Sequence, residues 1–146
     1  MKKSKKVFKE GPIHPSFIAD SIEKHQSKTT IGAHDIFLGQ VRADRIEEKV
    51  VQAIEYTSYE EMAQDKFDEI REATFDKFDI TCMHIYHSLG IVKAGEICLF
   101  VFVSSPHRKV AFQAIEFLVD KIKSEVPIFG KEIFEDQTHV WKVNQP

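Results

Sequence analysis

The chain has 146 residues, of which 42% are hydrophobic and 29% are charged, values typical of a soluble globular protein. Its net charge of −3 at pH 7 excludes the overall basic field that drives non-specific nucleic-acid binding. No apolar run has the length of a membrane span or a signal peptide, so we expect a cytoplasmic protein without a membrane contact. We expect one domain over residues 1–146, with residues 1–6 (MKKSKK) as a flexible basic tail.

The usual signatures of metal and cofactor sites are absent from the sequence. Cys82 and Cys98 lie in apolar stretches without the spacing of a metal-binding pair, and we interpret both as buried, reduced side chains. His84 and His87 are three residues apart in a predicted strand, which places their side chains on opposite faces. Because there is also no Gly-rich phosphate loop and no nucleophile elbow, the sequence predicts no metal site and no bound cofactor.

The first half of the chain predicts a short strand and turn at residues 7–13, a helix from Pro15 to about Gln26, and strands at residues 29–42 and 50–56. The helix is predicted from apolar residues at helical spacing, and the strands from β-branched and aromatic content or from alternation. Residues 43–49 (ADRIEEK) are polar and join the two strands, so we expect a mobile loop there.

The second half predicts a helix at residues 58–75, strands at residues 80–87 and 91–103, a long helix from residue 105 to before Pro127, and a hairpin around residues 135–138. Ser58 and Glu61 have the spacing of a capping box. We expect one turn at residues 88–90 and another at Gly95. Residues 97–103 (ICLFVFV) are typical of a central strand buried on both faces. This order of elements indicates an α+β fold.

The long helix brings cationic residues to both of its ends. Ser105 is expected to cap its first turn, with Pro106 at the first helical position. His107 and Arg108 follow, where free backbone N–H groups and a guanidinium can bind an anion. A surface ion pair of Arg108 is the alternative.

Lys123 lies in the last turn, beside the apolar face of the same helix. Burial, or a neighbouring cation such as Lys131, would lower the pKa of its amine and make the neutral amine a usable nucleophile or base. The alternative is a lysine that extends along the surface into solvent. Arg42, at the end of a predicted strand, is likewise either an anion ligand or a surface charge.

Several segments, in this order, resemble the large, catalytic subunit of molybdopterin synthase, the MoaE family. The matching stretches are GA at 32–33, FLGQVR at 37–42, EYTSY at 55–59, MA at 62–63, HSLG at 87–90, GE at 95–96, SSPHR at 104–108, AF at 111–112, and Ala114, Lys123, VPI at 126–128 and KE at 131–132. Each segment is short, but their joint order and spacing over residues 32–141 are specific to this family.

The resemblance implies an α/β hammerhead-like fold with a mixed or antiparallel sheet and three main helices. It also implies a homodimer that binds two copies of a small ubiquitin-like sulfur carrier (MoaD-like), forming a heterotetramer. In that family the carrier's C-terminal Gly-Gly tail, activated as a thiocarboxylate, enters a pocket of the large subunit. Two sulfurs are transferred to cyclic pyranopterin monophosphate, which produces the dithiolene of molybdopterin. An anionic pterin and a carboxylate-ended peptide both require a local cationic pocket.

The resemblance also assigns roles to individual residues. By position, Phe37 and Arg42 match the family's pocket residues, and His107 and Arg108 match its ligands for the substrate anion. Lys123 matches its essential lysine, which implies proton transfer or transient covalent attachment during sulfur transfer.

The chain departs from the family after Pro127. The family reads Ile-Trp-Lys-Lys-Glu, whereas residues 128–132 are IFGKE, so Gly130 stands where a functional lysine would be. Lys131 is the candidate replacement and second catalytic residue, because Gly130 frees the backbone. The alternative is a non-catalytic homologue that binds the carrier or the pterin. Ser88 also replaces a usual arginine, and the C-terminal tail, which in relatives can contribute a basic residue across the dimer, is short here.

Overall fold

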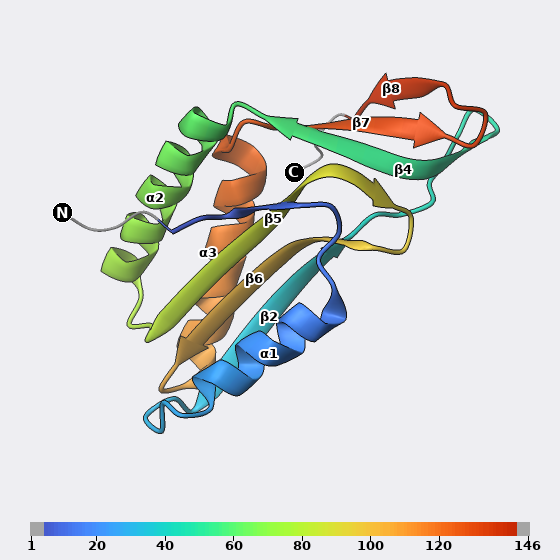
Figure 1. Ribbon diagram of the computed structural model, residues 1–146. Coiled ribbons are helices and arrows are strands. Elements are labelled where there is room, and N and C mark those ends of the chain that lie inside the picture. The colour runs from blue at the N-terminus through green and yellow to red at the C-terminus, as the bar shows by residue number, and fades with distance from the viewer. Residues whose placement is uncertain (1–4, 143–146) are drawn as a thin grey trace.

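The computed structural model describes residues 5–142, which form a mixed eight-stranded sheet and three helices (Figure 1). The strands are β1 (Phe8–Glu10), β2 (Ala33–Gln40), β3 (Arg45–Ile46), β4 (Lys49–Ser58), β5 (Cys82–Lys93), β6 (Ile97–Ser105), β7 (Ile128–Phe134) and β8 (His139–Trp141). The helices are α1 (Pro15–His25), α2 (Glu60–Lys77) and α3 (Arg108–Glu125). The predicted α+β class, with a mixed sheet and three main helices, is confirmed. No helix within residues 5–142 is long and apolar enough to cross a membrane.

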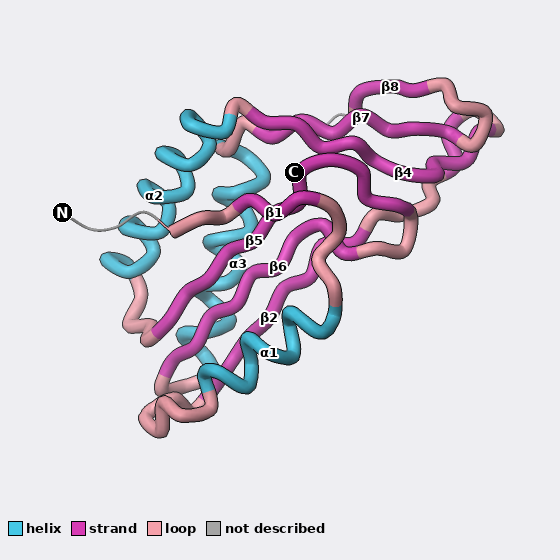
Figure 2. The backbone as a smooth tube through the Cα atoms, in the orientation of Figure 1, coloured by secondary structure: helices cyan, strands magenta, loops and turns pink. Residues whose placement is uncertain are grey.

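β6 is an interior strand of the sheet and lies between β2 and β5 in the order β2-β6-β5-β4-β7-β8 (Figure 2). Every residue of β6 after Ile97 is buried, which confirms the predicted central strand. On one face, Phe17 and Ile22 of α1 pack against Phe100 and Phe102. On the other face, α2 and α3 cover the main core. Apolar residues on both sides of one strand therefore hold three helices in two layers around the sheet.

β5 changes its partner along its length. Its first half pairs with β6, whereas its last residues, from Gly90, pair with β4. Gly90 has a φ of 84°, which a glycine adopts without steric cost. The predicted turn at residues 88–90 is therefore wrong, because these residues bend a continuous strand. The bend lets β3, β4, β7 and β8 extend away from the helices as an arm (Figure 1).

Two predicted helix caps are also wrong, because each serine belongs to a strand that continues past the expected boundary. Ser58 is the last residue of β4, and its hydroxyl donates to the Pro127 carbonyl at 2.8 Å. Ser105 is the last residue of β6, and its hydroxyl donates to the His107 carbonyl at 2.5 Å. Helices α2 and α3 consequently begin without a side-chain cap.

The loop expected at residues 43–49 is a hairpin rather than an irregular connection. β3 pairs with the start of β4, and Glu47 and Glu48 form the turn with φ values of 49° and 69°. A turn of this kind usually contains Asn or Gly, so the two glutamates gave no sequence signal for it. The C-terminal hairpin of β7 and β8 is confirmed, as is the burial of both unpaired cysteines.

The basic N-terminal segment lies only partly within the described residues. Residues 1–4 fall outside them, so the predicted tail is not described there. Lys5 and Lys6 run beside β5 and α2, and the Lys5 carbonyl accepts a hydrogen bond from Gln64 at 2.7 Å.

The two-layer packing predicts the effect of removing one core ring. Phe102 is fully buried between α1 and the sheet, so Phe102→Ala should lower the free energy of unfolding by about 3–5 kcal/mol in urea titrations. Phe112→Ala is the matched control, because Phe112 is 57% exposed and its loss should change stability by about 0.5 kcal/mol or less. Equal losses in the two variants would contradict the assigned core.

Candidate functional site

A cavity of about 420 Å³ opens where α3 ends and β7 begins. Its wall includes Lys123 from α3, Pro127, Phe129 and Gly130 from the start of β7, and Trp141 and Lys142 from the end of β8. The helix ends here because Val126, the residue before a proline, is extended, with φ −89° and ψ 130°. We call this hollow the lysine cavity.

Lys123 lines the lysine cavity. The residue as a whole is exposed, but the surroundings of its amine shift its pKa. Burial is the largest cause that lowers the pKa of Lys123, and the Lys142 cation lowers it further, while Cys98 opposes the shift. This environment favours a reactive amine over a lysine that simply extends into solvent.

The part of the sheet beneath Lys123, which we call the floor, includes two polar groups that remain neutral, near the buried Glu132. Burial chiefly, and the Lys123 cation in addition, lower the pKa of His87 to about 4, and its Nδ1–H donates to the Ser88 carbonyl at 2.8 Å. Burial and a hydrogen bond with Cys98 raise the pKa of Tyr56, whose ring lies 5.1 Å from that of His87. A neutral imidazole and a protonated phenol supply no buried charge to stabilise an ammonium group, which fits the lowered pKa of Lys123.

Gly130 and Lys131 face opposite sides of β7, because side chains alternate along a strand. Gly130 is paired with Tyr56, so a side chain there would point toward the floor, with its Cβ 3.0 Å from Ile54 Cγ2. Lys131 points the other way, and its amine lies 3.1 Å from Glu55 Oε1. Lys131, the predicted second catalytic lysine, is therefore paired with Glu55 on the outer face. Its catalytic role stays a prediction.

Lys142 is the amine that the sequence analysis missed. The β8 pairing places Trp141 opposite Lys131 on the outer face, so the next residue turns inward. The Lys142 backbone N–H donates to the Gly130 carbonyl at 2.8 Å, and its charge acts on Lys123. The alternation of side chains along the predicted C-terminal hairpin could have indicated that Lys142 points inward. It gave no prediction, because Lys142 lies beyond the last segment that resembles the family.

A second cavity, of about 530 Å³, lies at the opposite end of α3 and is lined by Gly32, Pro106, His107, Arg108, Lys109 and Phe112. The Gly32 N–H donates to the Ser105 carbonyl at 3.0 Å, and a Cβ at Gly32 would collide with the Pro106 carbonyl. Only glycine fits this close approach. Cationic side chains beside the free N–H groups of a helix start form an arrangement that attracts anions. We call this hollow the anion cavity.

The structure does not bring the two cavities together within one chain. At about 1.5 Å per residue, Arg108 lies about 22 Å along α3 from Lys123, and His107 immediately precedes the helix. These residues therefore do not line one pocket in a single copy.

Arg42 and Phe37 both belong to the β2 region. Arg42 follows β2 near Gly39, whose carbonyl accepts from the Cys98 thiol at 3.4 Å, so it lies at the Lys123 end of the sheet. Its side chain is 75% exposed and its Nε lies 3.3 Å from Asp44 Oδ1. Phe37 is half-buried in the middle of β2, against the core beneath α3.

Comparison with known proteins gives one consistent family. A family model described as "MoaE protein" matches residues 10–125. The molybdopterin synthase catalytic subunit of Pyrococcus abyssi is 36% identical over 79% of this chain and 76% of the relative. The subunit of Bacillus subtilis is 36% identical over 86% of this chain and 76% of the relative. The chain spans 56% of the rat relative's length, at 34% identity.

Solved structures support the same conclusion. The crystal structure of molybdopterin synthase from Staphylococcus aureus has a TM-score of 0.80 and 31% identity, covering 94% of this chain and 96% of that one. A protein–protein complex of subunits 1 and 2 of molybdopterin-converting factor from Helicobacter pylori has a TM-score of 0.79 over 95% of this chain and 90% of that one. At 18% identity that second match shows the fold alone. The chain belongs to the MoaE family, the family of molybdopterin synthase catalytic subunits.

Proposed function

We propose that this sulfurtransferase of molybdenum cofactor biosynthesis carries out its chemistry in the lysine cavity. Sulfur comes from the thiocarboxylated C-terminus of a small ubiquitin-like carrier and passes to cyclic pyranopterin monophosphate, which forms the dithiolene of molybdopterin. The observation that carries the proposal is the amine of Lys123, whose pKa is lowered at the wall of an open cavity. A neutral amine can accept a proton or attack the carbonyl carbon of a thiocarboxylate.

The rim of the lysine cavity suits a partner protein. Phe129 and Trp141 are 42% and 53% exposed, and both also line a neighbouring cavity of about 340 Å³ with Tyr59. Exposed aromatic side chains around a hollow are typical of interface centres. We propose that the carrier docks on this rim and that its Gly-Gly tail enters the lysine cavity.

Lys142 supplies the second amine in this proposal. Gly130 leaves the floor without the lysine that the family has there, and Lys142 places its charge beside Lys123 instead. Its cation lowers the pKa of Lys123 and adds positive charge for an anionic substrate. Lys131 is a weaker candidate because Glu55 already pairs with its amine.

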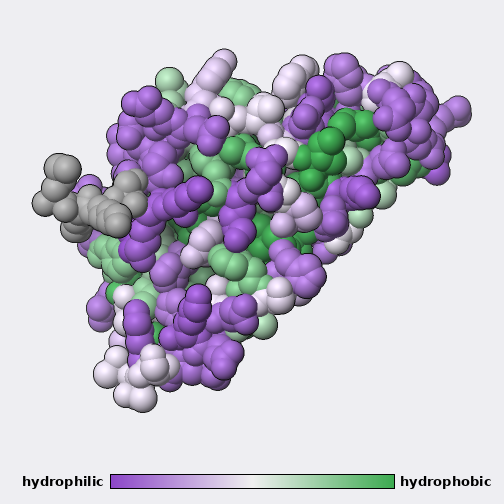
Figure 3. Space-filling model, viewed as in Figure 1, coloured by the Kyte–Doolittle hydropathy of each residue, from purple (hydrophilic) through white to green (hydrophobic). Residues whose placement is uncertain are grey.

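Two copies of the chain are needed to complete the site. His107 and Arg108 lie at the opposite end of α3 from Lys123, so one copy supplies the lysine cavity and the other the anion cavity. Figure 3 shows a hydrophobic area where the arm joins the rest of the sheet, and Ile91 in this part of β5 is 51% exposed. Exposed apolar surface of this kind commonly marks an interface. We propose a homodimer that binds two carriers as a heterotetramer.

Reconstitution from purified protein, thiocarboxylated carrier and cyclic pyranopterin monophosphate tests the role of Lys123. Lys123→Ala should reduce dithiolene formation at least about 100-fold, because the general base or nucleophile is lost. Carrier binding should persist in gel filtration. Lys121→Ala is the control, since Lys121 does not line the cavity and its pair with Glu125 at 3.0 Å is an exposed one, which contributes little. Retained turnover in Lys123→Ala would refute the role, and carrier binding without product in the wild type would support the non-catalytic alternative.

The pH dependence of kcat/KM distinguishes Lys142 from Lys131. The rate should rise with pH as Lys123 loses its proton, at a pH below that of an ordinary lysine. Lys142→Ala removes a cation that lowers the pKa of Lys123, so this rise should move to higher pH. Lys131→Ala should leave it in place. A shift in Lys131→Ala, with none in Lys142→Ala, would identify Lys131 as the second amine.

Subunit complementation tests the two-copy site. Lys123→Ala and Arg108→Ala chains, each inactive alone, are co-expressed with different tags, and the mixed dimers are isolated through both tags. Each mixed dimer has one intact site of two, so about half of wild-type activity should return. If no activity returns in verified mixed dimers, the two cavities do not act together across the dimer.

A further inference from the structure

Three side chains with metal-binding atoms meet on the face of the sheet that α1 covers. His25 is the last residue of α1, and Cys82 and His84 are two residues apart on β5, so they share a face of that strand. One ligand atom from each residue lies within 4.8 Å of the other two. The Nε2 atoms of His25 and His84 are 2.8 Å apart. His87, which belongs to the lysine-cavity floor, points to the other face.

His25 is already oriented as a metal ligand. Its Nδ1 lies 2.7 Å from the Ser21 carbonyl, which can only accept, so Nδ1 carries the proton. The lone pair on Nε2 is therefore directed at His84. A backbone carbonyl that fixes the tautomer of a histidine in this way is the usual outer-shell partner of metal-bound imidazoles. Phe102 packs against the ring, with centroids 4.8 Å apart.

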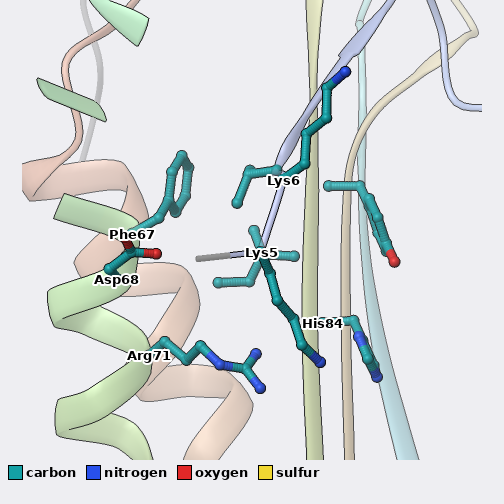
Figure 4. Close-up of a pocket in the computed structure, with 9 residues that line it drawn as sticks. Lys5, Lys6, Phe67, Asp68, Arg71 and His84 are labelled. Carbon is teal, nitrogen blue, oxygen red and sulfur yellow. The ribbon is translucent and has the colours of Figure 1, made fainter. Parts of the chain in front are cut away.

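The surroundings of the cluster decide which ions it accepts. The Lys28 amine donates to Cys82 Sγ at 2.9 Å. Figure 4 shows Arg71 reaching from α2 and Lys5 lying between its guanidinium and the His84 ring, so the cluster has cationic neighbours on this side. The cations of Lys5, Lys28 and Arg71 repel a hard metal ion, which would be bound by electrostatic attraction alone. A metal ion that forms a strong bond to the Cys82 thiolate can bind in spite of this repulsion.

We propose that His25, Cys82 and His84 form a site for a borderline or soft transition-metal ion, and that Zn²⁺ fits it best. Imidazole nitrogens and a thiolate are preferred zinc ligands, whereas Mg²⁺ and Ca²⁺ prefer oxygen. Binding forms two N–Zn bonds and one S–Zn bond, while the thiol proton goes to solvent and the proton of His84 moves from Nε2 to Nδ1. With N–Zn bonds of about 2.0 Å the two Nε2 atoms must separate to about 3.3 Å, a small change from 2.8 Å. Water or an anion takes the fourth position.

The ion would connect the end of α1 to β5, which lie 59 residues apart where His25 meets His84. A ligand that binds only the folded chain raises its stability in proportion to its affinity. The site is separate from the lysine cavity, so it neither supports nor weakens the sulfur-transfer proposal.

The test uses the full chain, reduced and stripped of metal, titrated with Zn²⁺ and with Co²⁺ as a spectroscopic probe. We expect one Zn²⁺ per chain, a thiolate-to-cobalt charge-transfer band, a higher melting temperature with Zn²⁺, and no effect of Mg²⁺. Cys82→Ser and His84→Ala should weaken Zn²⁺ binding at least about 100-fold and remove the band.

Matched controls keep the test specific. Cys98→Ser removes the other buried cysteine, and His34→Ala removes a histidine that bonds to Ser104 at 2.7 Å; both should bind like the wild type. Absence of stoichiometric binding by the folded wild type would overturn the proposal. Equal binding by Cys82→Ser and the wild type, or loss of binding in Cys98→Ser alone, would also overturn it. If Cys82→Ser does not fold, the charge-transfer band of the wild type compared with Cys98→Ser decides the question.

Discussion

The packing of α3 against the sheet fixes the positions of Lys123 at one end of the helix and of His107 and Arg108 at the other. Its buried face consists of Ala111, Ala114, Leu118 and Ile122, and small residues at the first two positions let the helix approach β2 and β6 closely. Its start is set by the contact of Gly32 with Pro106, and its end by Pro127. A rigid helix of this length holds the lysine cavity and the anion cavity about 22 Å apart. One copy of the chain therefore cannot bring both cavities to the same substrate.

The lysine cavity combines a lowered amine pKa with open access. Burial is the main cause that lowers the pKa of Lys123, and the cation of Lys142 lowers it further, while the neutral His87 and Tyr56 supply no negative charge to oppose them. In the proposed mechanism a glycine at position 130 is compatible with catalysis, because Lys142, which follows β8, adds a cation near Lys123. Family membership and this electrostatic arrangement support a sulfurtransferase more strongly than a non-catalytic binding protein.

The sequence predicted what depends on local patterns and could not predict what depends on distant partners. The helices and the central strand follow from apolar spacing, and the family follows from short segments in a fixed order. The caps at Ser58 and Ser105 failed, because both hydroxyl groups bond to backbone that strand pairing brings near them. The position of Lys142 beside Gly130 could not be predicted, because it depends on the register between β7 and β8. The His25–Cys82–His84 cluster could not be predicted because its first member lies on a helix far from the strand that holds the other two.

The most direct test of the central claim is a crystal structure of this protein with its thiocarboxylated carrier and inorganic phosphate. If Lys123 is the reactive amine, the carrier's last glycine lies within bonding distance of Lys123 Nζ, near Lys142. The account also predicts phosphate held between this cavity and the His107 and Arg108 side chains of a second copy. A carrier tail that ends away from Lys123, or a dimer in which both anion cavities face away from the lysine cavities, would contradict the account.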